Sequence, residues 1–135
     1  MLKKVARVFF GLLFLFVTYL TLTPNPDTTD QGMALTRWIA DLLFGYQDMG
    51  DKVAHFLAYG ALGFWAAGSQ VRLFGKHLYS VAALVCYGAL LELVQGLGGV
   101  RTPELADAIS NALGAFCGYL GVWGLHVLAA KRRAP

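Results

Sequence analysis

The chain has 135 residues, of which 57% are hydrophobic and only 14% charged, with a mean hydropathy of +0.56. Soluble domains carry about 25% charged residues, so this composition excludes an ordinary water-soluble protein and indicates residence in lipid. The net charge of +3 does not indicate nucleic-acid binding, because the basic residues are segregated along the chain in the way that membrane insertion explains.

The first predicted element is a membrane span at about residues 5–23, with lysines just before it. As a helix this run is about 28 Å long, enough to cross the hydrocarbon core. A signal peptide has an apolar core of only about 7–15 residues and a small-residue cleavage site, whereas this run ends in Thr-Pro-Asn-Pro. We therefore expect a retained span.

The loop at 24–50 contains a second predicted element. Apolar residues recur there at helical spacing, while Thr36, Arg37 and Asp41 fall on other faces. The apolar set is Leu35, Trp38, Ile39, Leu42 and Leu43. This pattern predicts a short amphipathic helix that lies in the membrane interface.

Three further spans are predicted at about 53–69, 78–97 and 104–130. Thr102, Pro103 and Glu104 are typical of an N-cap, a first-turn proline and a first-turn acid. Cys86 and Cys117 lie inside apolar runs, and we expect small buried hydrophobes rather than a disulfide. The expected fold is all-α: residues 1–135 form a single polytopic membrane domain with four transmembrane helices and the interfacial helix.

Orientation follows from the basic residues, because cytoplasmic loops are enriched in lysine and arginine. Only Arg37, Lys52 and Arg101 fall on the side opposite the termini, together with all eight acids. Eight basic residues share the side of the termini: Lys3, Lys4, Arg7, Arg72, Lys76, Lys131, Arg132 and Arg133. We expect both termini in the cytoplasm.

The extracytoplasmic ends of the last three spans each carry a polar pair whose spacing places both side chains on one helix face. The pairs are Asp51 with His55, Glu92 with Gln95, and Asp107 with Asn111. Arg101 lies in the short loop that joins two of these spans. Singly, Asp51 could be an N-cap, and Gln95 and Asn111 could join helices by hydrogen bonds. Their coincidence at one depth favours a shared site, because ionisable groups in membranes are retained mostly for function.

Helix packing is expected to support this convergence. Gly114 and Gly118 continue close to the Asp107 and Asn111 face of the last span. The spacing Gly-x-x-x-Gly lets a second backbone approach closely. The polar pair would then lie at the end of a helix-packing stripe.

These residues carry a resemblance to the VanZ-like family, small membrane proteins whose namesake is associated with resistance to the glycopeptide teicoplanin. The resemblance covers about 51–118. Its carriers are Asp51-Lys52-Val53-Ala54-His55-Phe56, Glu92-Leu93-Val94-Gln95, Arg101, Asp107, Asn111 and Gly114. It implies a bacterial inner-membrane protein connected with the cell envelope and with antibiotic resistance, but no particular chemistry.

Two functional classes remain open. In the first, an outward-facing polar pocket binds an anionic envelope component, a lipid headgroup or a cell-wall precursor. Arg101 and Lys52 would contact phosphate or carboxylate, with Asp51, Gln95 and Asn111 as further binding residues. The partners would be membrane lipids, with no nucleic acid. Oligomeric state and cofactor are not indicated.

The second class is an enzyme acting on such a headgroup. His55 would be the general base or acid, oriented by Asp51 or Asp107, with Glu92 as a second carboxylate. A variant would hold a divalent metal on His55 and two carboxylates. One histidine and acids on separate helices are a weak signal, so we assign no metal from the sequence.

Overall fold

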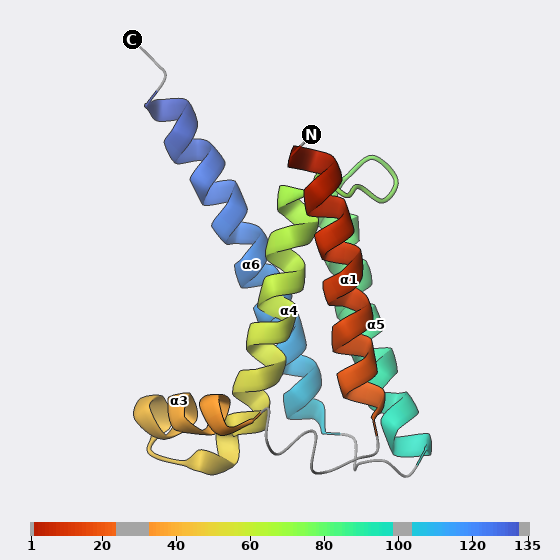
Figure 1. The fold of residues 1–135 in the computed structure, drawn as a ribbon, viewed down its shortest axis with the longest axis vertical. Helices are drawn as coiled ribbons and strands as arrows, with labels where there is room; N and C mark the ends of the chain where they lie inside the picture. The colour runs from red at the N-terminus through yellow and green to blue at the C-terminus, as the bar shows by residue number, and fades with distance from the viewer. Residues whose placement is uncertain (1, 24–32, 99–103, 133–135) are drawn as a thin grey trace.

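The described residues of the computed structural model, 2–23, 33–98 and 104–132, form an all-α protein with no strand among them. The elements are α1 (Leu2–Leu22), α3 (Ala34–Phe44), the 3-10 turn η1 (Gln47–Met49), α4 (Gly50–Gly68), α5 (His77–Leu97) and α6 (Leu105–Lys131). In Figure 1 the four long helices run along the long axis, α3 lies crosswise at one end, and both chain ends lie at the other. The predicted all-α class is confirmed.

Three of these helices, α1, α5 and α6, are long and apolar enough to cross a membrane. This confirms the prediction of a membrane protein with several spanning helices. The 19 residues of α4 are not among the apolar candidates, and its first turns carry Asp51, Lys52 and His55. A span by α4 therefore stays a prediction, as does the interfacial position of α3.

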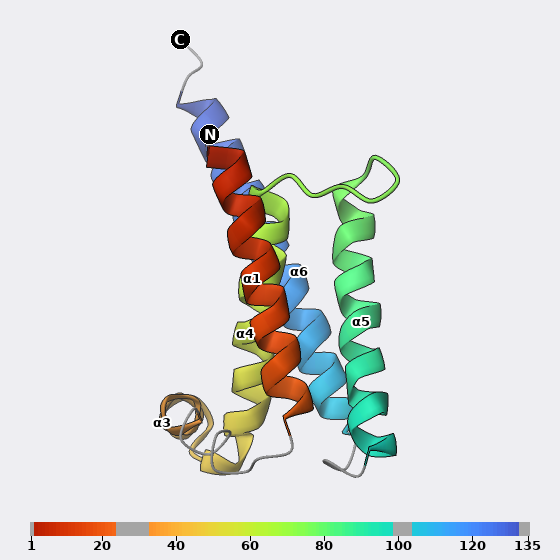
Figure 2. The same ribbon diagram turned by 45° about the vertical axis from the view of Figure 1, so that its right-hand side comes forward.

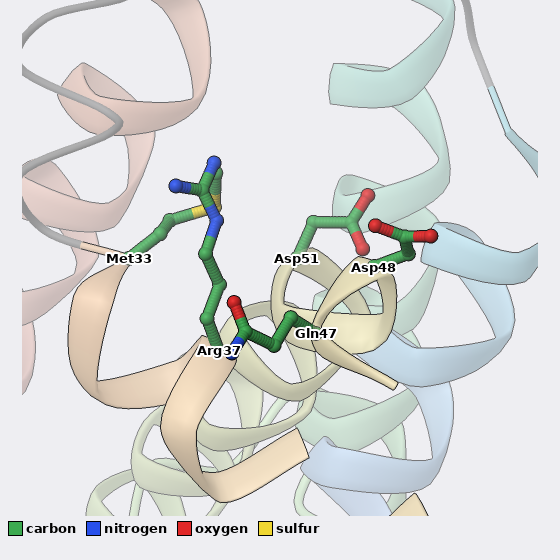
Figure 3. Close-up of a pocket in the computed structure, with 5 residues that line it drawn as sticks. All are labelled: Met33, Arg37, Gln47, Asp48 and Asp51. Carbon is green, nitrogen blue, oxygen red and sulfur yellow. The ribbon is translucent and has the colours of Figure 1, made fainter. Parts of the chain in front are cut away.

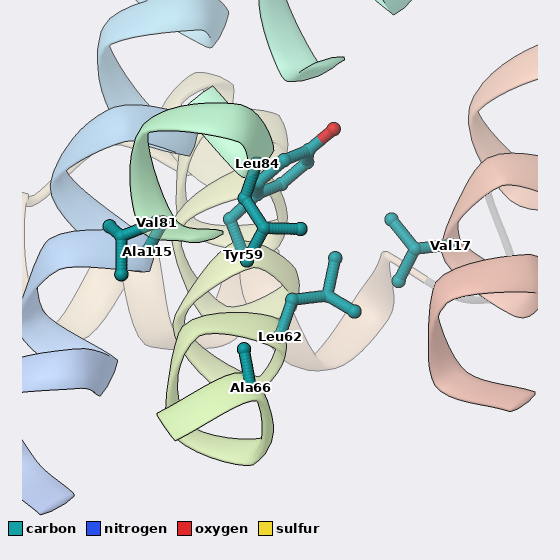
Figure 4. Packing of buried hydrophobic residues seen from close by; sticks show 7 residues of the cluster. All are labelled: Val17, Tyr59, Leu62, Ala66, Val81, Leu84 and Ala115. Carbon is teal, nitrogen blue, oxygen red and sulfur yellow. The ribbon is translucent and has the colours of Figure 1, made fainter. Parts of the chain in front are cut away.

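The hydrophobic core forms around α4, which contributes Tyr59, Leu62 and Ala66. One side chain from α1, two from α5 and one from α6 close the cluster (Figure 4): Val17, Val81, Leu84 and Ala115. The turned view in Figure 2 shows α1 passing close to α4, with α5 standing beside them. Large apolar side chains such as Leu12 and Leu93, 62% and 60% exposed, point outward instead, as lipid-facing positions do.

The contact between α4 and α6 depends on glycine. A Cβ atom at Gly114 would overlap the carbonyl oxygen of Phe56, one at Gly118 that of Gly60, and one at Gly63 that of Ala115. Each overlap is with main-chain atoms, which cannot swing aside as a side chain can. The predicted close approach at Gly114 and Gly118 is confirmed, and Gly63 extends it from the α4 side.

Three local predictions are corrected by the structure. Cys86 and Cys117 are free and exposed, because they lie on outer helix faces. Glu104 is the N-cap of α6, since its extended backbone leaves its carbonyl to accept the amides of Asp107 and Ala108; Thr102 and Pro103 lie outside the described residues. Asp51 lies in the first turn of α4 and the N-cap is Met49.

Candidate functional site

Polar side chains from three helices meet at the end of the bundle that carries α3. His55 on α4 and Asn111 on α6 are joined by a hydrogen bond of 3.0 Å between Nδ1 and Oδ1. A carboxamide oxygen can only accept, so Nδ1–H of His55 donates to it. Asn111 thereby fixes the tautomer and leaves the lone pair on Nε2.

His55 lies between two carboxylates from different helices. Its Nδ1 is 3.7 Å from Oε1 of Glu92 on α5, and its Nε2 is 3.8 Å from Oδ2 of Asp107 on α6. Glu92 and Asp107 are buried, at 5% and 0% exposure. The structure thus brings four of the predicted site residues, His55, Glu92, Asp107 and Asn111, together.

Lys52 forms the second part of the cluster. Its ammonium group donates to Oδ2 of Asp51 at 2.7 Å and to Oε2 of Glu104 at 2.5 Å. Oδ1 of Asp107 lies 3.4 Å away. Lys52 directly precedes the predicted span 53–69.

The cluster combines acids and bases. Its acids are Asp51, Glu92, Glu104 and Asp107, and they lie around Lys52 and His55. Arg101, which the sequence predicts at this site, lies outside the described residues.

Gln95, the remaining predicted binding residue, makes its described contact elsewhere. Its side-chain amide donates to the main-chain carbonyl of Thr21, in the last turn of α1. The last carbonyls of a helix have no partner within that helix, so Gln95 satisfies one of them. Gln95 and Glu92 are three residues apart and share one face of α5, as predicted, but that face also contacts α1.

An open pocket of about 380 Å³ lies beside the cluster. It is lined by Met33, Arg37, Gln47, Asp48 and Asp51. Figure 3 shows Arg37 extending from α3 on one side, and the carboxylates of Asp48 and Asp51 on the other. Asp51 belongs to both the pocket and the Lys52 cluster, so the two are continuous.

Sequence reasoning missed Arg37 and Glu104 as members of this region. Arg37 is placed by the close contact of α3 with α4: a Cβ atom at Gly50 would lie 2.5 Å from Cγ of Arg37 and 2.9 Å from its Cα. In the sequence, the glycine at position 50, directly before Asp51, could have indicated that another helix packs closely there. Glu104 was interpreted only as a helix-start acid, although its neighbour across the bundle is Lys52.

Comparison with known proteins identifies one family. A family model described as VanZ/LLP1 matches residues 10–128, a longer stretch than the 51–118 that carries the sequence resemblance. No curated protein and no solved structure gives a significant match.

Proposed function

The chain belongs to the VanZ/LLP1 family, and on this premise we propose that it is a bacterial inner-membrane protein whose extracytoplasmic end binds an anionic headgroup of a lipid or cell-wall precursor. The observation that carries the proposal is the convergence of polar side chains at one end of an apolar bundle, beside an open pocket. A link to glycopeptide resistance is part of the proposal and comes from the family's namesake alone.

In the proposed topology α4 crosses the membrane together with α1, α5 and α6, which gives four spans, and α3 lies in the extracytoplasmic interface. Thr36 and Ala40 of α3 are buried, whereas Leu35, Trp38 and Leu42 are more than 60% exposed. A helix that packs its small residues on protein and leaves its large apolar residues uncovered suits a membrane surface. Both termini would then lie in the cytoplasm, at the end opposite α3 (Figure 1).

Reporter fusions test this topology. An alkaline phosphatase fused at Gln47, beside α3, should be active, because this enzyme folds only after export to an oxidising compartment. A fusion at the C-terminus should be inactive. The reverse pattern of activities would place the site in the cytoplasm and would contradict binding of an extracytoplasmic ligand.

The pocket suits a headgroup that carries more than an anion. Arg37 can contact phosphate or carboxylate with two parallel hydrogen bonds, while Asp48 and Asp51 can accept from hydroxyl or amine groups. Lys52 contributes less to anion binding than we expect from the sequence, since its ammonium group already contacts Asp51, Glu104 and Asp107. In this proposal Arg37, which lines the pocket, also contacts the anion.

Binding can be measured by native mass spectrometry of protein released from nanodiscs that contain phosphatidylglycerol and phosphatidylcholine in equal amounts. The wild-type protein should retain phosphatidylglycerol in preference to phosphatidylcholine. Arg37→Gln should reduce this preference about tenfold or more, because a hydrogen bond to a charged group contributes ~1.5–3 kcal/mol. The matched control Arg72→Gln, at the other end of the bundle, should keep it. Equal loss in both variants would show non-specific electrostatics and refute the pocket.

An enzyme acting on the headgroup is the second candidate, and the geometry of His55 favours it. Its tautomer is fixed by Asn111, and two buried carboxylates flank its ring. Acid–base catalysis uses this kind of arrangement. If the protein chemically converts the headgroup, the mass of the bound lipid should change on incubation. His55→Gln should prevent that change.

A further inference from the structure

Three potential metal ligands from three helices lie within reach of one ion. His55, Glu92 and Asp107 each offer one ligand atom, and these atoms all lie within 4.8 Å of one another. Tetrahedral zinc with bonds of ~2.0–2.1 Å spaces its ligands about 3.4 Å apart. Asp107 already faces Nε2 of His55 at 3.8 Å. Oε1 of Glu92 lies 3.7 Å from Nδ1 of the same ring, so the Glu92 side chain would rotate toward Nε2 to share an ion there.

The carboxylate of Asp107 has one oxygen near a cation and one that is not: Lys52 lies 3.4 Å from Oδ1, while Oδ2 faces His55. Asp107 is 0% exposed, and neither carboxylate oxygen accepts a hydrogen bond from any residue that the structure describes. Oδ2 instead faces Nε2 of His55 at 3.8 Å. Since Asn111 holds the proton on Nδ1, Nε2 and Oδ2 are both acceptors, and two buried acceptors that face one another repel unless a proton or a metal lies between them.

The hydrogen bond between His55 and Asn111 is of the kind that orients histidine ligands in metal sites. A ligating histidine commonly donates its other N–H group to a carbonyl or carboxylate, which orients the ring and raises the basicity of the ligating nitrogen. Oδ1 of Asn111 accepts that hydrogen bond here.

We propose that Nε2 of His55 and the carboxylates of Glu92 and Asp107 bind a divalent metal ion of the Zn²⁺ or Mn²⁺ class. Imidazole with carboxylate is a donor set that such ions accept, and three protein ligands leave a coordination position open. The metal-bound His55 cannot serve as a base. The site rests on these three side chains and not on the proposed headgroup, so either proposal can fail alone.

A second acidic group, Asp51, Glu104 and Asp107, also has its oxygens within 4.8 Å of one another. We assign no metal to it, because the ammonium group of Lys52 contacts all three carboxylates. This contact explains the acidic group without a metal. Lys52 lies on the Oδ1 side of Asp107, so Oδ2 still faces His55.

Titration with Mn²⁺ tests the metal site directly. Detergent-purified protein is stripped with EDTA, and Mn²⁺ binding is measured by calorimetry; Mn²⁺ avoids thiolate ligands and so ignores Cys86 and Cys117. The wild-type protein should bind Mn²⁺ saturably and gain thermal stability, since a ligand that binds only the folded state raises Tm. Asp107→Asn and His55→Gln should each weaken binding at least tenfold.

The matched controls are Asp41→Asn on α3 and His126→Gln near the other end of α6, both exposed positions, and they should bind Mn²⁺ as the wild type does. If one site variant does not fold, the other still tests the ligand set. Absence of saturable binding and of a Tm rise in the wild type would overturn the proposal. Binding by both site variants with wild-type affinity would overturn it equally.

Discussion

Replacing Gly118 with leucine is expected to separate α4 from α6 and to lower the free energy of unfolding by about 3 kcal/mol or more. Overpacking a core usually costs ~1–3 kcal/mol, because neighbouring side chains can shift. At Gly118 the atoms in the way are the carbonyl oxygen of Gly60 and the amide nitrogen of Phe64 at 2.7 Å, both in the main chain of α4. Unfolding by SDS in mixed micelles measures the loss.

The same helix supplies the control. A Cβ atom at Gly121 would meet nothing within 4 Å, so Gly121→Leu should leave stability unchanged or raise it by up to ~1 kcal/mol, since leucine favours helix over glycine. Because both variants add the same side chain to α6, their difference isolates the packing term. Equal stability of the two would contradict the close contact between α4 and α6.

Hydropathy and helical spacing predicted those parts of the fold that have a local sequence pattern. The predicted runs 5–23, 78–97 and 104–130 correspond to α1, α5 and α6, because apolar length is a local property. The amphipathic pattern from Leu35 to Leu43 indicated a helix where α3 lies. What spacing does not give is the docking of α3 on α4, which depends on the absence of a side chain at Gly50.

In the candidate site, too, local spacing could be predicted from the sequence whereas contacts between helices could not. Spacing places two residues on one helix face, and so His55, Glu92 and Asp107 were expected to lie near one another, as they do. Which helix that face meets is a tertiary property, and so the contact of Gln95 with α1 could not be predicted. The roles of these residues in binding or catalysis stay predictions.

Replacing Lys52 with methionine is expected to destabilise the extracytoplasmic end of the bundle by about 3 kcal/mol, measured by SDS unfolding in EDTA. Removing one partner of a buried ion pair costs ~3–5 kcal/mol, because the remaining charge is stranded. The side chain of Lys52 is 20% exposed and that of Glu104 44%, whereas that of Asp107 is 1% exposed. Water can therefore reach part of the network, which places the expected loss at the lower end.

A second substitution tests whether the lost stability comes from the stranded carboxylate of Asp107. Lys52→Met combined with Asp107→Asn removes the most buried of the stranded charges, so the double variant should be more stable than Lys52→Met alone, a coupling that additive effects would not give. The matched control is Lys4→Met, an exposed lysine at the opposite end, whose effect should stay within ~0.5 kcal/mol. A double variant less stable than the single one would show that Asp107 is stabilised without Lys52, by His55 or by another cation. The contacts of Lys52 would then contribute little to stability, and its three carboxylates would need separate explanations.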